Sequence, residues 1–208
     1  MKFGSKTRKY KAPPQATIDL PRELFNLAKI DAPDFLISAS NWLSNSFQAT
    51  ERSNAFLRLA AELNDQQFWM LFHACWTTFE KIDELRFEDE INKRRDSCEK
   101  SYLRADDQKF YDSLPREVTI YRGQDADDLV GLSWTTSRDV AASFAVGHRG
   151  ILNARPFLIE VIIVKNDIAG AYTDRNQSEI VIYDFANDVD VVSSEILQSY
   201  VAGKLTTN

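Results

Sequence analysis

The sequence predicts an α+β fold in which a layer of helices precedes a β-rich core. The prediction depends on a change in the spacing of apolar residues near Pro115. Before this proline, apolar side chains recur every three or four positions, which is the period of an amphipathic helix. After it, the apolar runs are short and rich in Val, Ile and aromatic residues, which is typical of β-strands. With 208 residues, 44% of them hydrophobic, the chain can bury a sizeable core, so we expect one domain, or one domain with a helical annex.

Three segments are expected from this pattern. Residues 1–16 form a basic, flexible tail, with several Lys and Arg and no acidic residue over the first eleven positions. Residues 17–114 form the helical layer, and residues 115–208 form the β-rich core.

Within the helical layer, apolar side chains mark three helices and a charged segment marks a fourth. The first two apolar stretches are 35–47 and 55–63, and the third is a broad face over 68–82 that Asp65 is expected to cap. The mostly charged segment 88–104 is expected to be an exposed helix.

In the core, β-branched and aromatic runs predict five strands, and one helix separates the second strand from the third. Ser137 is a suitable N-cap for that helix, which is alanine-rich and ends before Gly147. The predicted strands are Val118–Tyr121, Leu132–Thr135, Phe157–Val164, Ile180–Tyr183 and Val189–Val192.

The net charge and the length of the apolar runs limit the classes of function that we expect. The net charge of -6 argues against a protein that coats nucleic acid, although the tail and Lys93-Arg94-Arg95 are local basic spots. These spots are either solvated surface, a phosphate-contacting patch or a docking site for a partner. No apolar run is long enough to span a bilayer, and no apolar leader follows the first lysines. We therefore expect a cytoplasmic protein without a membrane partner, with delivery into a target cell left open.

The few cysteines and histidines predict neither a disulfide framework nor a metal site. Cys75 and Cys98 lie in helix-like segments, and the two histidines are scattered along the chain. A structural zinc site needs four such ligands at close spacing. We expect reduced thiols and no metal.

Three motifs place a different polar group at the edge of an apolar strand. Tyr121-Arg122-Gly123 provides a cation, and Ser133-Trp134-Thr135 with the following Thr136-Ser137 provides hydroxyls. Gln177-Ser178-Glu179, followed by Ile-Val-Ile, provides a carboxylate. A cation, a hydroxyl and a carboxylate suit a sugar-phosphate substrate whose sugar carbon becomes cationic during the reaction.

In their order, spacing and strand context, these motifs resemble those of mono-ADP-ribosyltransferases of the arginine–serine–glutamate class. The resemblance covers roughly residues 115–193. It implies an NAD-cleaving transferase with NAD as co-substrate and a split, mixed β-core with a central NAD cleft. In such a core, an arginine ends the first strand and a Glu/Gln-x-Glu motif enters a later one.

The resemblance assigns roles to the first two motifs. Arg122 is the candidate anion anchor, because its guanidinium holds phosphate oxygens at two points. Gly123 allows close approach of the backbone, and the resemblance implies that its main chain holds the nicotinamide amide. Thr135 stands where the family has its first serine, whose hydroxyl orients the catalytic carboxylate or contacts the nicotinamide ribose. Ser133 is the alternative source of this hydroxyl, since Ser133-Trp134-Thr135 also aligns with the motif.

The third motif carries the expected catalytic group. Glu179 would stabilise the positive charge on the ribose by accepting a hydrogen bond from its 2′-hydroxyl. The resemblance implies that Gln177, in place of glutamate, goes with acceptors other than arginine. A protein amide and a nucleic-acid base remain open as the acceptor.

The segment 145–156 matches the loop that holds phosphate and nicotinamide in the family. Arg149 is expected near the pyrophosphate, and Phe144 either stacks on nicotinamide or belongs to the core. Residues 170–176 match the acceptor-recognition loop, with Asp174 where family members often carry an aromatic residue.

The expected function is transfer of ADP-ribose from NAD to a macromolecule, in an intracellular toxin or effector with an antitoxin or inhibitor protein as a partner. This setting follows from the family's habits alone. Two rivals are an NAD glycohydrolase, in which water is the acceptor, and an interaction module with an inactive C-terminal half.

Overall fold

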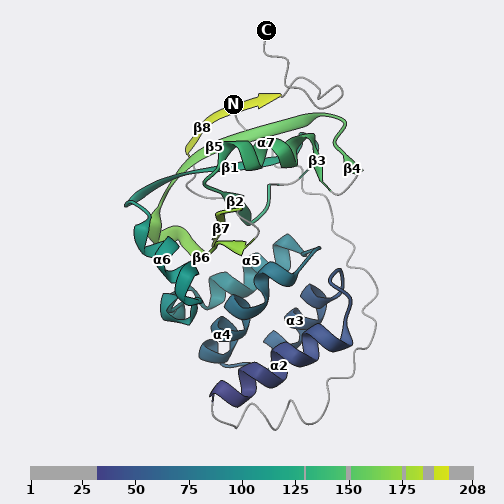
Figure 1. Ribbon diagram of the computed structural model, residues 1–208, viewed down its shortest axis with the longest axis vertical. Coiled ribbons are helices and arrows are strands. Elements are labelled where there is room, and N and C mark those ends of the chain that lie inside the picture. Colours follow the sequence, from purple (N-terminus) through teal and green to yellow (C-terminus); the bar gives the residue numbers. More distant parts are fainter. Residues whose placement is uncertain (1–31, 129, 149–150, 175–176, 185–189, 197–208) are drawn as a thin grey trace.

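A computed structural model describes residues 32–128, 130–148, 151–174, 177–184 and 190–196 (Figure 1). The tail expected over 1–16 lies outside these residues. The described chain is of the α+β class, with a helical layer followed by a β-sheet (Figure 1). The change in character near Pro115 is confirmed, because the last helix of the layer ends at Ser113 and the first strand begins at Glu117.

The helical layer differs from the prediction at two boundaries. Asn64, and not Asp65, caps the third apolar helix, and its side chain and that of Gln67 form a reciprocal capping box. In place of the helix expected over 88–104, a helix ends at Lys93 and two short 3-10 turns follow it. The layer comprises α2 (Ala32–Ser46), α3 (Arg52–Ala60), α4 (Asp65–Cys75), η1 (Trp76–Thr78), α5 (Glu84–Lys93), η2 (Arg95–Ser97), η3 (Lys100–Tyr102) and α6 (Ala105–Ser113).

The described strands form a six-stranded sheet with the order β6-β7-β2-β1-β5-β8. All five predicted strands are present, with ends shifted by a few residues, and α7 (Arg138–Val146) follows β2 as expected. The strands of the sheet are β1 (Glu117–Asp125), β2 (Ser133–Thr135), β5 (Pro156–Val164), β6 (Ile168–Tyr172), β7 (Glu179–Ile182) and β8 (Asp190–Ile196).

The expected split, mixed β-core is wrong on both counts for the described strands. Every neighbouring pair in the six-stranded sheet is antiparallel, and the strands form one continuous sheet. A separate two-stranded ribbon pairs β3 (Gly147–His148) with β4 (Ile151–Leu152). Strand direction is set by contacts between distant segments, so the local pattern did not determine it.

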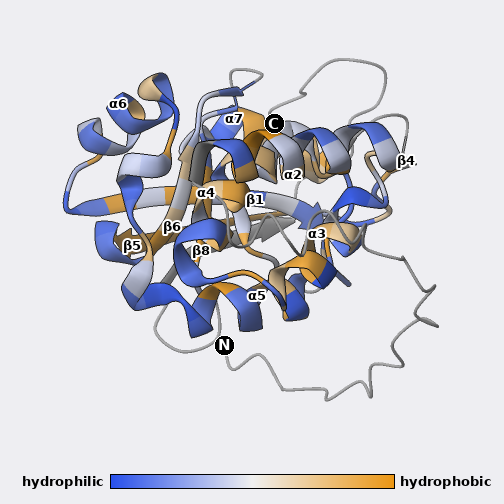
Figure 2. Ribbon diagram, turned by 90° about the horizontal axis from the view of Figure 1, so that it is seen from below, coloured by the Kyte–Doolittle hydropathy of each residue, from blue (hydrophilic) through white to orange (hydrophobic). Residues whose placement is uncertain are grey.

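Two hydrophobic clusters lie on the two sides of the sheet. The larger cluster combines the aromatic side chains of α3 and α4 with residues of β6 and β7, including Tyr172 and Val181. The smaller one combines β1, β2, β5 and β7 through residues such as Ile120 and Trp134. Hydrophilic residues cover the outer turns of α5 and α6 (Figure 2). The helical layer therefore shares one hydrophobic core with one face of the sheet, where β6 and β7 lie.

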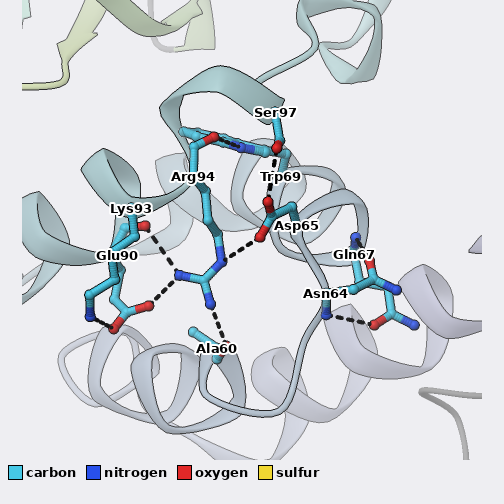
Figure 3. A network of polar contacts seen from close by, with 9 residues as sticks. All are labelled: Ala60, Asn64, Asp65, Gln67, Trp69, Glu90, Lys93, Arg94 and Ser97. Carbon is cyan, nitrogen blue, oxygen red and sulfur yellow. Dashed lines mark hydrogen bonds and ion pairs between the residues drawn. The ribbon is translucent and has the colours of Figure 1, made fainter.

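The basic spot at 93–95 is engaged within the fold. The Arg94 guanidinium is largely buried, where it pairs with Glu90, lies 3.4 Å from Asp65 and donates to the Ala60 carbonyl at 3.0 Å (Figure 3). Lys93 also pairs with Glu90, at 2.9 Å. Arg94 thus joins the end of α3, the start of α4 and the end of α5, and the solvated reading of this spot is wrong for Arg94.

His73 in α4 makes stability depend on pH. Burial, together with the positive charge of Lys100, lowers the pKa of His73 to about 3. Its Nδ1 lies 3.0 Å from the Tyr172 hydroxyl, while its Nε2 has no hydrogen-bond partner within the described chain. The neutral ring is therefore the form that this core accepts.

We expect acid to destabilise the protein through His73. A histidine whose pKa is lower in the folded than in the unfolded state contributes fully above about pH 6.5, and its contribution is lost as the pH falls toward 3. Between pH 7 and 5 this loss amounts to about 2 kcal/mol. Urea unfolding of the wild type and His73→Gln at both pH values measures it. An equal pH dependence in the two proteins would contradict the assignment.

Candidate functional site

Arg122 lies in β1 with its side chain largely buried. Its Nη1 donates to the Ser133 carbonyl at 2.6 Å, and its Nε donates to Oε1 of Gln124 at 2.8 Å. Its Nη2 lies 3.6 Å from Oε1 of Glu84. Burial lowers the pKa of Arg122, and the carboxylates of Glu84, Asp128 and Glu179 oppose this effect. The guanidinium remains charged at any pH at which the protein is folded.

Ser133 connects this arginine to the predicted catalytic carboxylate. Its Oγ donates to Oε1 of Glu179 at 2.6 Å, while its carbonyl accepts from Arg122. One residue at the start of β2 therefore contacts both charged groups. The cation, the hydroxyl and the carboxylate predicted from the sequence meet at one place.

The sheet register explains this meeting. Strand β2 lies between β1 and β7, and Thr135 is directly opposite Glu179. Ser133 is two residues from Thr135, so the side chains of all three residues lie on one face of the sheet. Ser133 and Glu179 are therefore diagonal neighbours on adjacent strands, within reach of polar side chains.

Among the described residues, the hydrogen bonds of the Thr135 hydroxyl go to the backbone and not to the Glu179 carboxylate. Its Oγ1 donates to the Gln177 carbonyl at 2.5 Å and accepts from the Ser137 backbone N–H at 3.0 Å. Its side chain is buried. Of the two hydroxyls left open by the sequence, Ser133 is the one that contacts Glu179, and Thr135 fixes the backbone on either side of the site.

The helical layer contributes two side chains that the sequence analysis did not single out. Trp76 donates from Nε1 to Oε1 of Glu179 at 2.8 Å, the same oxygen that accepts from Ser133. Glu84, at the start of α5, accepts from the Leu132 backbone N–H at 3.0 Å and faces Arg122. For Trp76 the sequence offered one chemical signal, which is that a buried indole N–H requires a hydrogen-bond acceptor.

Gly123 provides space for α7. A Cβ on this residue would lie 1.8 Å from the Ala141 carbonyl oxygen and 2.5 Å from the Ala145 nitrogen. Ser137 caps α7 as predicted, accepting from the Val140 N–H at 3.4 Å. The close approach of backbone that was expected at Gly123 is made by a helix of the same chain.

The other predicted site residues lie nearby or outside the described chain. Gln177 is half-buried and precedes Ser178, whose φ of 45° is in the left-handed region. Such backbone strain in a non-glycine residue is concentrated at functional sites. Phe144 is half-buried on α7, and Arg149 lies outside the described residues.

The segment expected to form the acceptor loop begins as a strand. Gly170 to Tyr172 belong to β6, and the Tyr172 side chain is fully buried. Asp174 follows, accepting from Thr77 Oγ1 at 2.6 Å and pairing with Arg104 at 2.7 Å. The helical layer therefore holds the part of this loop that the structure describes.

A polar cavity of about 390 Å³ lies beside this loop. Its described lining does not include Arg122, Ser133 or Glu179, but Thr77 directly follows Trp76 in the chain. The lining residues are Ala49, Arg52, Thr77, Thr78, Glu80 and Asp174.

Over the described residues, no group of His, Cys, Asp and Glu is arranged to hold a metal ion. In the same part of the chain, no helix has both the length and the apolar character needed to cross a membrane. Comparison with models of protein families, with curated proteins and with solved structures gave no match.

The indole of Trp76 is expected to position the Glu179 carboxylate. For the NAD cleavage that the motif resemblance implies, we predict that Trp76→Phe lowers kcat by about tenfold with little change in KM, because a donor to Oε1 is lost. Trp69→Phe is the matched control, since its buried indole donates to the Arg94 carbonyl at 2.9 Å. Steady-state kinetics and thermal unfolding of both variants separate positioning from stability. A similar kcat in both variants would contradict the positioning role.

Proposed function

We propose that this protein is an NAD-dependent mono-ADP-ribosyltransferase that transfers ADP-ribose to a macromolecule. One observation carries the proposal: Ser133 binds Arg122 through its carbonyl and Glu179 through its hydroxyl. The same residue therefore contacts the arginine that is proposed to bind phosphate and the carboxylate that is proposed to act on the ribose. The positive φ of Ser178, directly before the carboxylate residue, supports a functional role for this turn.

In the proposed reaction, the bond between ribose and nicotinamide breaks before the acceptor has bonded fully. Positive charge then develops on the ribose, and the Glu179 carboxylate stabilises it while accepting a hydrogen bond from the 2′-hydroxyl. Ser133 and Trp76 hold Oε1 of this carboxylate in place, so little reorganisation is needed as the charge forms. Nicotinamide departs as a neutral molecule, and no general acid is required.

The role proposed for Arg122 requires its guanidinium to bind a phosphate beside Glu84. In the structure its guanidinium already faces this carboxylate at 3.6 Å, and both side chains are partly exposed, by 18% and 28%. The pyrophosphate would therefore bind against a like charge. Removing that charge should strengthen NAD binding.

We predict that Glu84→Gln lowers the KM for NAD by about fivefold, because a carboxylate close to the bound phosphate is neutralised. Glutamine retains an oxygen that can accept from the Leu132 N–H. Asp89→Asn, an exposed change on the same helix, is the control for the loss of one charge. An unchanged or higher KM in Glu84→Gln would argue that Arg122 only holds the two layers together.

The acceptor in this proposal is a protein amide or a nucleic-acid base. The Gln177 side chain would face the acceptor next to Glu179, and an amide both donates to and accepts from neutral polar groups. An arginine acceptor would be served better by a second carboxylate at this position.

Incubation with NAD labelled in the adenylate part tests the proposal. We expect release of nicotinamide and transfer of label to protein or nucleic acid from a cell extract. Label that appears only as free ADP-ribose would identify the rival NAD glycohydrolase. Absence of nicotinamide release under all these conditions would contradict both enzymes and favour an interaction module.

A further inference from the structure

The two cysteines occupy contrasting environments. Cys75 is buried, with 3% of its surface exposed, and burial raises the pKa of its thiol to about 11. Cys98 is half-buried and lies between the exposed residues Ser97 and Glu99. Because oxidants react with accessible thiolates, Cys98 is the more reactive of the two.

A lysine amine lies directly against the Cys98 sulfur. Nζ of Lys100 is 2.9 Å from Sγ, and it also donates to the Ala169 carbonyl at 3.0 Å and the Tyr183 hydroxyl at 3.3 Å. The rings of Tyr111 and Tyr183 have their centroids 5.6 and 5.4 Å from Nζ. The amine is therefore held next to the sulfur by a carbonyl, a hydroxyl and two aromatic rings.

The surroundings also favour the neutral form of this amine relative to an exposed lysine. Burial lowers the pKa of Lys100; the neighbouring Cys98 opposes this effect, and the charge of Arg95 adds to it. A neutral amine is a nucleophile, whereas an ammonium is not. The proposed function of the NAD site uses neither Cys98 nor Lys100.

We propose that Cys98 and Lys100 form an oxidative modification site at which a peroxide joins the sulfur to the nitrogen. In the first step the thiolate attacks hydrogen peroxide, giving a sulfenic acid and water after uptake of a proton. In the second step the Lys100 amine attacks the sulfenyl sulfur, an S–N bond forms, the S–O bond breaks and water leaves. In sum, thiol, amine and one peroxide give a sulfenamide and two waters, with sulfur oxidised and peroxide reduced.

The crosslink would remove a charge from the boundary between the helical layer and the sheet. Lys100 belongs to η3, and its partner Ala169 belongs to β6, which pairs with the strand that carries Glu179. A sulfenamide nitrogen lacks the ammonium charge that attracts the two tyrosine rings. A thiol reductant would reverse the change by cleaving the S–N bond.

Mass spectrometry of the folded full-length protein tests this site. After treatment with hydrogen peroxide and digestion with trypsin, we expect a peptide that contains Cys98 and Lys100, lacks two hydrogens and is not cleaved after Lys100. Dithiothreitol should restore both its mass and its cleavage. Peptides in which Cys98 carries only added oxygens, with normal cleavage after Lys100, would overturn the proposal.

Two control experiments test whether the crosslink depends on the Lys100 amine and on the folded structure. Lys100→Arg keeps a cation but removes the amine nucleophile, so Cys98 in this variant should proceed to sulfinic acid. The urea-unfolded wild type should likewise lose the crosslink, because the held geometry is lost. The same crosslink yield in folded and unfolded protein would show that the packing around Lys100 plays no part. None of these readouts depends on NAD.

Discussion

Replacing Glu179 by glutamine is expected to lower NAD turnover by at least about 10²-fold. Glutamine has nearly the same shape, but it lacks the negative charge that stabilises the developing cation on the ribose. Its amide oxygen can still accept from Ser133 and Trp76, both of which donate to Oε1 in the wild type, so the variant changes the charge and not the position of the side chain. The chemical step should therefore lose its main stabilising group, while NAD binding at Arg122 is largely retained.

The control for this variant is Glu117→Gln. Glu117 also begins a strand, at the exposed end of β1, and is remote in the strand register from the Ser133 contacts. Nicotinamide release should be unchanged in this control and nearly absent in Glu179→Gln, with both proteins folded by circular dichroism. Equal turnover in Glu179→Gln and the wild type would refute the catalytic assignment.

Gly123→Ala is expected to destabilise the fold by about 2–3 kcal/mol or more. The added Cβ would overlap the backbone of α7 at Ala141 and Ala145, and backbone cannot move aside as a side-chain tip can. Either α7 must shift away from β1 or the strand must bend. Both changes would affect the neighbouring Arg122 and reduce turnover as well.

Urea unfolding measures this effect, with Thr119→Ala as the comparison. Thr119 is a half-buried residue of the same strand, and its truncation should cost about 1 kcal/mol or less. A Gly123→Ala protein as stable as the wild type would show that the contact between β1 and α7 is loose. It would also return Gly123 to the ligand-binding role that the motif implied.

The class of the fold and most of its elements could be predicted because they follow from local patterns. Helical spacing and β-branched runs depend on neighbouring residues only. Strand β6 was missed, since Ile168–Tyr172 is buried along its whole length and contains Gly170, so it neither alternates nor resembles a β-branched run. The antiparallel direction of the strands depends on long-range pairing, and the motif resemblance implied a mixed sheet instead.

The site was predicted in its cation, hydroxyl and carboxylate but not in its support. Arg122 and Glu179 stand at strand positions that a motif can mark, and Ser133 was retained as an alternative to Thr135. Trp76 was interpreted as part of a core stripe, because its partner Glu179 lies 103 positions away. Helical periodicity indicates which side chains are buried, but it does not indicate which polar atom they meet.

Glu84 was missed for a related reason. In the sequence it lies between the apolar face over 68–82 and the charged segment 88–104, and a solvated surface position is the usual place for such a residue. Only the packing of α5 against the start of β2 shows that its carboxylate meets the Leu132 N–H and Arg122. Contacts between the helical layer and the sheet therefore could not be inferred from either segment alone.

The central claim is that Arg122, Ser133 and Glu179 bind one NAD molecule, and a crystal structure with a cleavage-resistant NAD analogue tests it most directly. We predict pyrophosphate oxygens on the Arg122 guanidinium, and the 2′-hydroxyl of the nicotinamide ribose within hydrogen-bond distance of Glu179. An analogue bound away from these residues, with no phosphate on Arg122, would contradict the account.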